Sequence, residues 1–381
     1  MFSRTGYGKK AWNDFSILIM ASVRWYNASA HYALFLAEGL KKAGYNVFLF
    51  GIPESPIIIS AKELGITTLD DIDLMDSNPI SYIRKIDRFR SIVSERKINI
   101  INPHISRDHS FAYFSLIDKK IPLIRTKTDS TLPRNNLLNR FFYMHSARHY
   151  TISSSSMASA LKSMGIDDKF ISIIPLEMNY RDFSDYKPQK NLKLELNIPD
   201  NRIVISFIGR LDRIKGVDHF IKSYSFLKEN NKNKFHYIVS GEEINLSTDY
   251  LMRIAKETKL DNISFIGRLS DVRDILSITD IGVIPSIGSE TICRIALEML
   301  SFGLPIIGSN VNSIPEVISD YEGIVIDPAK PNEIAKALET LSHNKNYIKK
   351  KTKIKSKIAH KNPQRFIIEY LEIYSKARDG M

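Results

Sequence analysis

Glycines and cations follow the apolar run Ile203 to Phe207 at a spacing suited to binding an anion. Gly209 and Arg210 come first, and Lys215 and Gly216 precede a helical pattern. Glycine permits a tight turn and a close approach of the backbone, and two cations at a strand end can clamp a diphosphate. Taken alone, basic loop residues are more often simply solvated. The segment therefore gains weight only alongside other features of the chain.

Two glutamates, Glu290 and Glu298, lie near the start and in the middle of a predicted helix over Ile292 to Phe302. Apolar residues recur on one face of this helix at Ile292, Ile295, Ala296, Met299 and Leu300. Ser289 or Glu290 is expected to cap the helix, so the amides from Thr291 to Arg294 would face an anion.

Each glutamate has a structural and a functional interpretation. Glu298 can form a surface pair with Arg294 one turn earlier, although a cation before an anion is the weaker order on a helix. Glu290 in the first turn would complement the helix dipole. Alternatively, both carboxylates can accept hydrogen bonds from sugar hydroxyls. Both interpretations stay open at this point.

Short apolar runs alternate with helix-length amphipathic stretches, a pattern typical of parallel sheets with helical crossovers. In the first half, strands are predicted at Ser16–Met20, Asn46–Phe50, Ile98–Asn102, Leu123–Thr126, His149–Ile152 and Ile171–Ile174. Helices are predicted there at Ser29–Ala43, closed by Gly44, and at Pro79–Arg96, Asp108–Leu116 and Ser153–Met164.

A polar connection at Pro175–Asp200 separates this series from a second one. Its strands are predicted at Ile203–Phe207, Phe235–Val239, Ile263–Phe265, Ile281–Ile284, Pro305–Gly308 and Gly323–Ile326. Its helices are predicted at Val217–Leu227, Tyr250–Thr258, Ile292–Phe302 and Pro331–Leu341. Two such series predict an α/β fold of two Rossmann-like, doubly wound domains that face each other across a cleft, with ligands beyond the carboxyl ends of the strands.

Composition limits the class of protein. A chain of 381 residues with 43% hydrophobic content can bury two cores, and its one cysteine, Cys293, cannot form an internal disulfide. The apolar run Phe15–Val23 is too short to span a membrane. Lys9 and Lys10 precede it, as in a signal peptide, but a buried first strand is the favoured interpretation.

The formal net charge of +12 predicts attraction to phosphate ligands, anionic lipid or nucleic acid. Lysines gather at Lys345–Lys361, where a solvated helix or linker is favoured over a membrane contact; the basic helix Arg84–Arg96 offers the same alternative. No nucleic-acid motif accompanies them, so no nucleic-acid partner is expected. Asp71-Ile72-Asp73 spells a metal-binding triplet but lies in an acidic surface stretch, and no metal site is predicted.

The two motif segments together resemble retaining glycosyltransferase family 4, whose members have the two-domain GT-B fold. Gly209, Arg210, Lys215 and Gly216 match the family's Gly-Arg-x4-Lys-Gly segment, and Glu290 with Glu298 matches its Glu-x7-Glu motif. The text from Ala296 to Gly308 and at Ile314-Pro315-Glu316 is also similar, so the resemblance is specific from about Ile203 to Leu341.

The resemblance implies a role for each matched residue. Arg210 and Lys215 would hold the donor diphosphate, Glu290 would contact the transferred sugar, and Glu298 would bind the ribose. Backbone groups around Gly267 and Arg268 would line the base, and Thr291 and Ile292 would lie beside the pyrophosphate. The family retains the anomeric configuration and uses no metal or further cofactor, so cations and amides stabilise the departing diphosphate.

The chain also departs from the family. Thr291-Ile292-Cys293 replaces the usual Gly-Phe-Gly, and the glycine-rich loop after the first strand is absent. Trp25 and Tyr26 stand in that loop and are expected to pack more readily than to stack on sugar. His104 matches a histidine-bearing strand end and is a catalytic candidate, whereas Arg125 to Asp129 occupy the place of a second family histidine.

These observations predict a cytoplasmic glycosyltransferase, peripheral at the inner face of the plasma membrane, which uses a nucleotide diphosphate sugar and a cell-envelope glycan or lipid-linked acceptor. The expected domains are 1–178 on the acceptor side, 179–362 for the nucleotide sugar, and a helix at 363–381 that crosses back. The alternatives are a nucleotide-sugar epimerase of related architecture and a degenerate, non-catalytic protein that binds sugar nucleotides or membranes.

Overall fold

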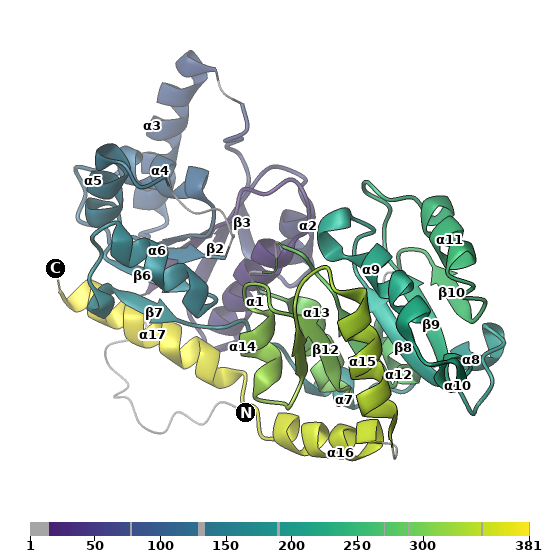
Figure 1. The fold of residues 1–381 in the computed structure, drawn as a ribbon. Helices are drawn as coiled ribbons and strands as arrows, with labels where there is room; N and C mark the ends of the chain where they lie inside the picture. Colours follow the sequence, from purple (N-terminus) through teal and green to yellow (C-terminus); the bar gives the residue numbers. More distant parts are fainter. Residues whose placement is uncertain are drawn as a thin grey trace. The chain divides into compact units, whose positions relative to one another are not determined.

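The chain forms two α/β units, and the strands within each unit are parallel (Figure 1). The computed structural model describes residues 15–76, 78–128, 134–188, 191–269, 271–288, 290, 292–343 and 346–380. The N-terminal unit comprises the described residues up to Leu176 together with those from Asn362 onward, and the C-terminal unit is Glu177–Lys361.

Seven parallel strands build the N-terminal unit. They are β1 (Ser16–Met20), β2 (Asn46–Phe50), β3 (Thr67–Leu69), β4 (Ile100–Pro103), β5 (Ile124–Lys127), β6 (His149–Ile152) and β7 (Ile171–Ile173). They pair in the orders β3-β2-β1-β4 and β5-β6-β7, and a bridge between Ile101 and Leu123 links the two sets. The strand order changes direction at β1 and β4, so the loops after these strands form the switch point of the unit.

Helices surround this sheet. They are α1 (Ala28–Lys42), α2 (Pro56–Glu63), α3 (Pro79–Glu95), α4 (Ser106–Ser115), α5 (Leu137–His145), α6 (Ala158–Ser163) and α17 (Gln364–Asp379), with short 3-10 turns η1 (Ser155–Met157) and η2 (Asp168–Phe170). The side chain of Asn27 caps α1 by accepting a hydrogen bond from the amide of Ala30 at 2.9 Å. Gly44, with φ of +93°, follows its last turn as glycine does after many helices.

The last helix, α17, belongs to the N-terminal unit, where it packs on α1 (Figure 1). The ring of Phe366 lies 5.2 Å from that of Tyr32. The hydroxyl of Tyr370 donates to the hydroxyl of Tyr32 at 3.0 Å, and the hydroxyl of Tyr374 donates to Oδ1 of Asn102 at 2.7 Å. Because all of these groups are buried, the hydrogen bonds tie the final helix to β4 and α1.

Six parallel strands build the C-terminal unit. They are β8 (Ile203–Ile208), β9 (Phe235–Ser240), β10 (Ile263–Ile266), β11 (Ile281–Ile284), β12 (Ile306–Ser309) and β13 (Ile324–Ile326). Their order, β10-β9-β8-β11-β12-β13, is that of a doubly wound dinucleotide-binding sheet. The switch point lies between β8 and β11.

The helices of this unit lie between its strands and after them. They are α7 (Arg181–Ser184), α8 (Leu192–Glu195), α9 (Val217–Lys222), α10 (Glu229–Lys232), α11 (Thr248–Glu257), α12 (Arg273–Ile278), α13 (Arg294–Ser301), α14 (Ile314–Ser319), α15 (Pro331–Ser342) and α16 (Asn346–Ala359), with 3-10 turns η3 (Arg213–Lys215) and η4 (Ser223–Phe226). The helix predicted at Val217–Leu227 is therefore α9 followed by a tighter turn.

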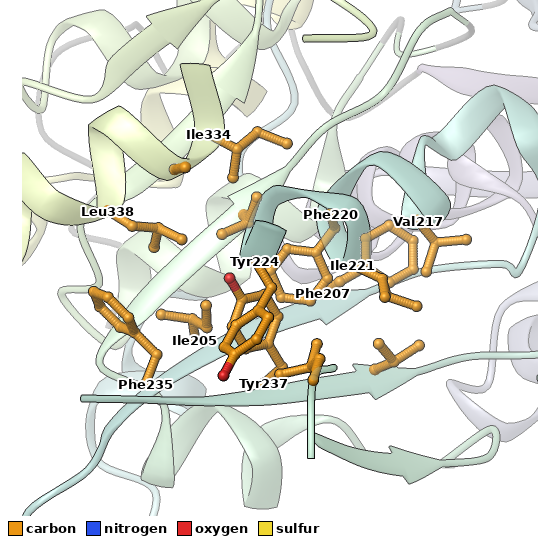
Figure 2. Close-up of a cluster of buried hydrophobic side chains, with 14 of the residues drawn as sticks. Ile205, Phe207, Val217, Phe220, Ile221, Tyr224, Phe235, Tyr237, Ile334 and Leu338 are labelled. Carbon is orange, nitrogen blue, oxygen red and sulfur yellow. The ribbon is translucent and has the colours of Figure 1, made fainter. Parts of the chain in front are cut away.

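Apolar side chains from both layers fill the core of the C-terminal unit (Figure 2). Phe207 and Tyr237 rise from β8 and β9 toward Phe220 of α9, and the rings of Phe220 and Tyr237 are 4.9 Å apart. Ile334 and Leu338 of α15 close the cluster. Burial of side chains of this size stabilises the fold by about 1.5 to 3 kcal/mol each.

Lysines of α16 bind carbonyl groups of this unit. The ammonium groups of Lys350 and Lys357 donate to the carbonyls of Glu322 and Asp320, at 2.7 and 2.6 Å, just beyond the end of α14. Lys351 donates to the carbonyl of Thr279 at 3.3 Å. Cations stabilise the carboxyl end of a helix, so this part of the lysine cluster has a role within the fold. Lys345 lies outside the described residues.

Across the described parts of both units, no helix combines the length and the apolar character that crossing a membrane requires.

Candidate functional site

The predicted anion-binding residues gather at the switch point of the C-terminal unit. The loop after β8 carries Gly209 to Gly216, and the loop after the neighbouring strand β11 carries Glu290. Since both loops follow the carboxyl ends of adjacent parallel strands, they meet at one edge of the sheet.

Hydrogen bonds fix the β8 loop. The amide of Leu211 donates to the carbonyl of Glu242 at 2.7 Å, and Asp212 accepts from the amide of Ile214 at 3.2 Å through Oδ1. The amide of Ile287 donates to the carbonyl of Ile214 at 2.9 Å, which joins this loop to the β11 loop. The two loops therefore form a connected support for side chains.

Gly216 sets how closely the two loops approach. Its φ is +68°, and a Cβ placed there would lie 2.0 Å from the carbonyl oxygen of Pro285. Both the backbone conformation and the contact exclude a side chain. Glycine at this position thus brings the end of the β8 loop against the β11 loop.

Lys215 and Glu290 form an ion pair across the two loops, between Nζ and Oε1. Only 16% of the lysine side chain and 10% of the glutamate side chain are exposed. The hydroxyl of Ser286 also donates to Oε1 of Glu290, at 2.7 Å. A cation and a carboxylate are therefore held together, largely out of water, at the switch point.

Arg210 is the more accessible cation of this edge. Its side chain is 51% exposed, and Nη2 lies 3.8 Å from Oδ2 of Asp212. An exposed pair at this distance is weak, so the guanidinium can turn to an arriving anion. Arg210 and Lys215 thus offer one mobile and one fixed cation on the same loop.

Gly267 and Arg268 follow β10, two strands away from β8 in the sheet. A Cβ placed on Gly267 would meet no atom within 4 Å. The hydroxyl of Ser240 donates to the carbonyl of Gly267 at 3.0 Å, and Arg268 lies 3.3 Å from Glu242 as an exposed pair. The backbone at Gly267 is therefore open to a ligand.

Helix α13 begins later than predicted. It starts at Arg294, and Cys293 precedes it with a left-handed φ of 47°, so neither Ser289 nor Glu290 caps it. The carbonyl of Glu290 accepts from the amide and the hydroxyl of Ser313 at 3.0 and 2.6 Å, and these bonds compete with the first helical hydrogen bond. The predicted row of helical amides is thus wrong at its start. Thr291 and Ser289 lie outside the described residues.

Ile292 and Cys293 are buried beneath this loop. Burial raises the pKa of the Cys293 thiol, which is therefore no ready nucleophile. These two side chains anchor the backbone that runs from Glu290 to α13. Ile292 and Cys293 belong to the triplet that replaces the Gly-Phe-Gly of the family that the sequence resembles.

Glu298 does pair with Arg294, with Nε and Oε1 separated by 2.7 Å. The pair is not a surface pair of the kind that the structural interpretation considered, because only 5% of the Glu298 side chain is exposed. Burial raises the pKa of this carboxyl, and the nearby guanidinium opposes the shift. A buried carboxylate that one cation neutralises could exchange this partner for ligand hydroxyls.

His104 lies in the N-terminal unit, at the end of β4, where its amide donates to the carbonyl of Met20 at 2.8 Å. The side chain is fully buried, and neither ring nitrogen has a hydrogen-bond partner among the residues that the structure describes. Burial, followed by the charge of Arg125, lowers the imidazole pKa to about 3. The ring is therefore neutral at physiological pH.

Two buried charged residues accompany His104, and sequence reasoning did not bring them together. Asp108 accepts from the amide of Ser22 at 2.8 Å, while its Oδ1 has no partner within the described part of the chain. Burial raises the Asp108 pKa to about 6. Arg125 donates to the carbonyl of Pro103 at 3.0 Å. A charged residue in the first turn after a predicted strand end was the available signal for Asp108.

The loop after β1 also corrects one expectation. Trp25 does not pack, because 78% of it is exposed. Tyr26 is partly exposed, and its hydroxyl lies 3.4 Å from Nδ1 of His31.

Asp129 lies outside the described residues. The Asp71-Ile72-Asp73 triplet contributes instead to the surface through a 2.7 Å ion pair between Asp71 and Arg88. Within the described residues, no cluster of three or more metal-ligating side chains occurs.

Part of the C-terminal unit is similar to a known family of proteins. Residues 188–361 match the family model described as Glycosyl transferases group 1. This range covers the β8 and β11 loops, Gly267 and Glu298, and so includes the whole constellation described above for that unit.

Curated proteins are similar to about half of this chain. An uncharacterized glycosyltransferase of Methanocaldococcus jannaschii is 28% identical over 48% of this chain and 46% of its own length. Spore coat protein SA of Bacillus subtilis is 25% identical over 50% of this chain and 53% of its own length. The chain spans about half the length of such relatives.

Solved structures extend the likeness over both units. A glycosyltransferase of Rickettsia africae has a TM-score of 0.85 at 17% identity and covers 96% of this chain and 99% of its own. HepE of Anabaena, solved in complex with UDP, has a TM-score of 0.77 at 13% identity and covers 95% and 100%. At these identities the likeness concerns the fold. It confirms the predicted class, a parallel α/β fold of two Rossmann-like domains with neighbours of the GT-B type.

Proposed function

We propose that this protein transfers a sugar from a nucleotide diphosphate sugar to a cell-envelope glycan or lipid-linked acceptor, with retention of configuration and without a metal. The motif spacing supports assignment to family 4. The observation that carries the proposal is the meeting of Lys215, Glu290 and the more exposed Arg210 at the switch point of a glycosyltransferase group 1 domain.

A diphosphate at this edge would find both cations of the β8 loop. Arg210 is free to turn toward it, and Lys215 would share its charge between the phosphate and Glu290. Because Lys215 is largely buried, the part of its charge that turns from Glu290 to the departing diphosphate is screened less by water than the charge of a solvated lysine. In this proposal the leaving phosphate then helps to remove the proton of the acceptor.

Glu290, relieved of part of its pairing, would accept hydrogen bonds from hydroxyls of the transferred sugar. Glu298 would bind the ribose, the backbone at Gly267 and Arg268 would line the base, and the backbone at Ile292 would lie beside the diphosphate. Solved neighbours support a uridine donor as the first one to test, since HepE has been solved with UDP and with UDP-glucose.

The acceptor side is assigned to the N-terminal unit, where His104, Asp108 and Arg125 are buried at strand ends. His104 is the catalytic candidate there, because its two ring nitrogens have no partner within the described residues. The net charge of +12 supports work at an anionic membrane surface, in the cytoplasm, on a lipid-linked substrate.

The test combines donor binding with turnover in matched variants. A thermal-shift screen with UDP, GDP and ADP and their glucose conjugates identifies the base, because a ligand at about 100 times its Kd stabilises the fold by about 2.7 kcal/mol. Turnover of the best donor is then compared in Arg210→Ala and Glu290→Gln. The glutamine keeps the volume of the glutamate. Lys215 therefore loses its counter-charge in this variant but keeps its packing.

We expect both variants to lose about 100-fold or more in kcat/KM, as for the loss of one group that stabilises developing charge. Arg213→Ala is the control, because Arg213 stands in the same loop with its guanidinium over the ring of Tyr250, 5.7 Å from the centroid. Unchanged turnover in Arg210→Ala would overturn the site. Accumulation of an epimer from donor alone would indicate an epimerase, and tight donor binding with no turnover over a broad acceptor panel would indicate a non-catalytic protein.

A further inference from the structure

Large apolar side chains lie exposed along one side of α5 and at the end of α4. Leu137 and Leu138 are each 83% exposed, Phe141 is 62% exposed and Met144 is 47% exposed. Ile117, in the turn after α4, is 63% exposed. We call these five residues the α4–α5 face. It is confined to the N-terminal unit.

Packing within the unit does not account for this face. Helix α5 already meets α4 through Phe142, whose ring lies 5.0 Å from His109 and 5.5 Å from Tyr113, and Tyr143 is buried beside them. The exposed residues 137, 141 and 144 follow one another at i, i+4 and i+7 on the other side of the helix. A stripe at this spacing is normally polar where it faces solvent. An apolar stripe on both sides of a surface helix indicates a second contact.

A groove continues the face between α4, α5 and η2. Its volume is about 560 Å³, and its lining includes Ile117 and Met144 of the face together with Phe170. Three cations line the same groove, namely Lys119, Lys120 and Arg148. The groove is thus apolar on one part of its wall and basic on another.

The cations around the face lack strong carboxylate partners. Within the described residues, Arg134, Arg140, Arg148 and Lys120 form no ion pair. Lys119 is 3.9 Å from Asp118, which Arg90 holds at 2.6 Å. The other nearby acids, Asp167 and Asp168, each pair with a lysine of their own, at 3.3 and 2.7 Å.

The two basic segments that the sequence singled out differ from this region. In α3, Lys85 and Arg88 pair with Asp76 and Asp71 at 3.0 and 2.7 Å. In α16, lysines bind carbonyls beyond the end of α14, as described above. Several cations of both segments are therefore already engaged within the fold, whereas the four cations of this region named above form no ion pair within the described residues.

We propose that the α4–α5 face docks on an anionic lipid bilayer. Leu137, Leu138 and Phe141 enter the boundary between headgroups and acyl chains, and the arginines of the helix and its flank meet headgroup phosphates. A second copy of the chain is a poorer occupant, because a two-fold interface would bring like cations together. The inference deepens the proposed function, since it rests on work at a membrane surface and names the surface that makes contact.

The experiment is flotation of the full chain with vesicles of phosphatidylcholine and phosphatidylglycerol at about 3:1 and about 0.1 M salt. The double variant Leu137→Asn/Leu138→Asn is expected to bind at least tenfold more weakly. Because both side chains are almost fully exposed, folding is unaffected. The control Leu194→Asn changes a leucine of the C-terminal unit that is 74% exposed and is expected to bind as the wild type does.

A second pair of variants tests the charges. Arg134→Gln/Arg140→Gln is expected to reduce binding about fivefold per cation, and this loss disappears in vesicles of phosphatidylcholine alone. Lys330→Gln/Lys336→Gln removes the same charge from the C-terminal unit and is expected to bind as the wild type does.

Wild-type binding by Leu137→Asn/Leu138→Asn would overturn the proposal. So would a wild-type dimer that this variant converts to a monomer without any change in flotation. Turnover of UDP-glucose is measured in parallel without vesicles. Suppose that neither the wild type nor any variant turns over a donor, while the wild type and the variants float with vesicles as expected. The proposed function is then wrong and the docking surface stands.

Discussion

The ion pair between Lys215 and Glu290 is the residue-level feature on which the proposed chemistry depends. Both side chains are too buried for water to solvate their charges fully. Each charge is therefore stabilised mainly by the other until a ligand binds. Removing one partner from a buried pair commonly costs about 3 to 5 kcal/mol, which would mix stability with activity. An amide in place of the carboxylate removes the charge but keeps the volume and an oxygen that can accept from Lys215, which limits this cost.

The residues of the site differ in how far the sequence could predict them. The positions of Lys215 and Glu290 after two predicted strands indicated that they lie close together. The loops after adjacent parallel strands lie at the same edge of a sheet. Spacing could not show that Ser286 donates to Glu290 or that Ser313 holds its carbonyl. These contacts depend on loop conformation, and no periodic pattern records that conformation.

Buried titratable groups at His104 predict how the protein responds to acid. The His104 pKa is lowered from 6.5 to about 3, so between these values the unfolded chain binds a proton that the folded chain does not. Stability is therefore lost as the pH falls below about 6.5. We expect His104→Gln to flatten the acid side of the stability curve by about 1.4 kcal/mol per pH unit. Urea unfolding between about pH 4 and 6.5 measures this slope.

Asp108 provides the opposite control. Its pKa is raised from 3.8 to about 6, so in that range the folded chain holds a proton that the unfolded chain has lost. Its contribution to stability therefore falls as the pH rises, and Asp108→Asn should make the acid dependence steeper. Equal slopes for the wild type and both variants would show that these groups are not buried in solution.

At the scale of elements, we predict a graded effect of glycine substitutions in three different loops, of which the β8 loop is the most sensitive. Gly216→Ala combines a left-handed φ with a contact to the Pro285 carbonyl, and we expect a loss of about 3 kcal/mol or more. Gly44→Ala has the left-handed φ without any nearby atom, and should cost about 1 kcal/mol. Chemical denaturation of the two variants separates the contact from the backbone strain.

Gly267→Ala serves as the reference, since it has neither feature and should stay within about 0.5 kcal/mol of the wild type. If Gly216→Ala were no more destabilised than Gly44→Ala, the close approach of the two loops would be wrong.

Elements with strong apolar periodicity followed the sequence closely. The strands Ser16–Met20, Asn46–Phe50, His149–Ile152 and Ile281–Ile284 have the bounds that were predicted. Within the described residues, eight short helices and strands were not predicted, namely α2, β3, α5, α7, α8, α10, α12 and α14. Most of them have too few residues for a period to repeat, and in α5 apolar residues on both sides of the helix obscured its amphipathic pattern.

The start of α13 illustrates a different kind of failure. Local sequence favoured a cap at Ser289 or Glu290, yet the helix begins at Arg294 because a contact with Ser313 competes for the Glu290 carbonyl. Residues 290 and 313 are distant in the chain, so only the folded sheet brings them together. Helix ends that border a ligand site are where such competition is to be expected.

At the scale of the whole molecule, the tyrosines of α17 predict how strongly the end of the chain supports its beginning. The hydroxyl of Tyr374 donates to Asn102 within a buried site, so Tyr374→Phe leaves an acceptor without its donor. We expect a loss of about 1 to 3 kcal/mol in the stability of the N-terminal unit. Thermal unfolding measures the change.

Tyr82→Phe is the matched control, since Tyr82 is 39% exposed and should tolerate the loss of its hydroxyl within about 0.5 kcal/mol. A Tyr374→Phe protein as stable as this control would indicate that α17 is held by its apolar contacts alone.

The N-terminal unit is assembled from two stretches that the whole C-terminal unit separates in the chain. During synthesis on the ribosome, the segment Glu177–Lys361 emerges in one piece, whereas the first unit waits for helix α17 until all of the second unit has been made. The order of completion should therefore be the reverse of the usual one for tandem domains, with the second unit mature first. A stop codon directly after Lys361 would release a chain whose later unit is intact and whose earlier unit is not.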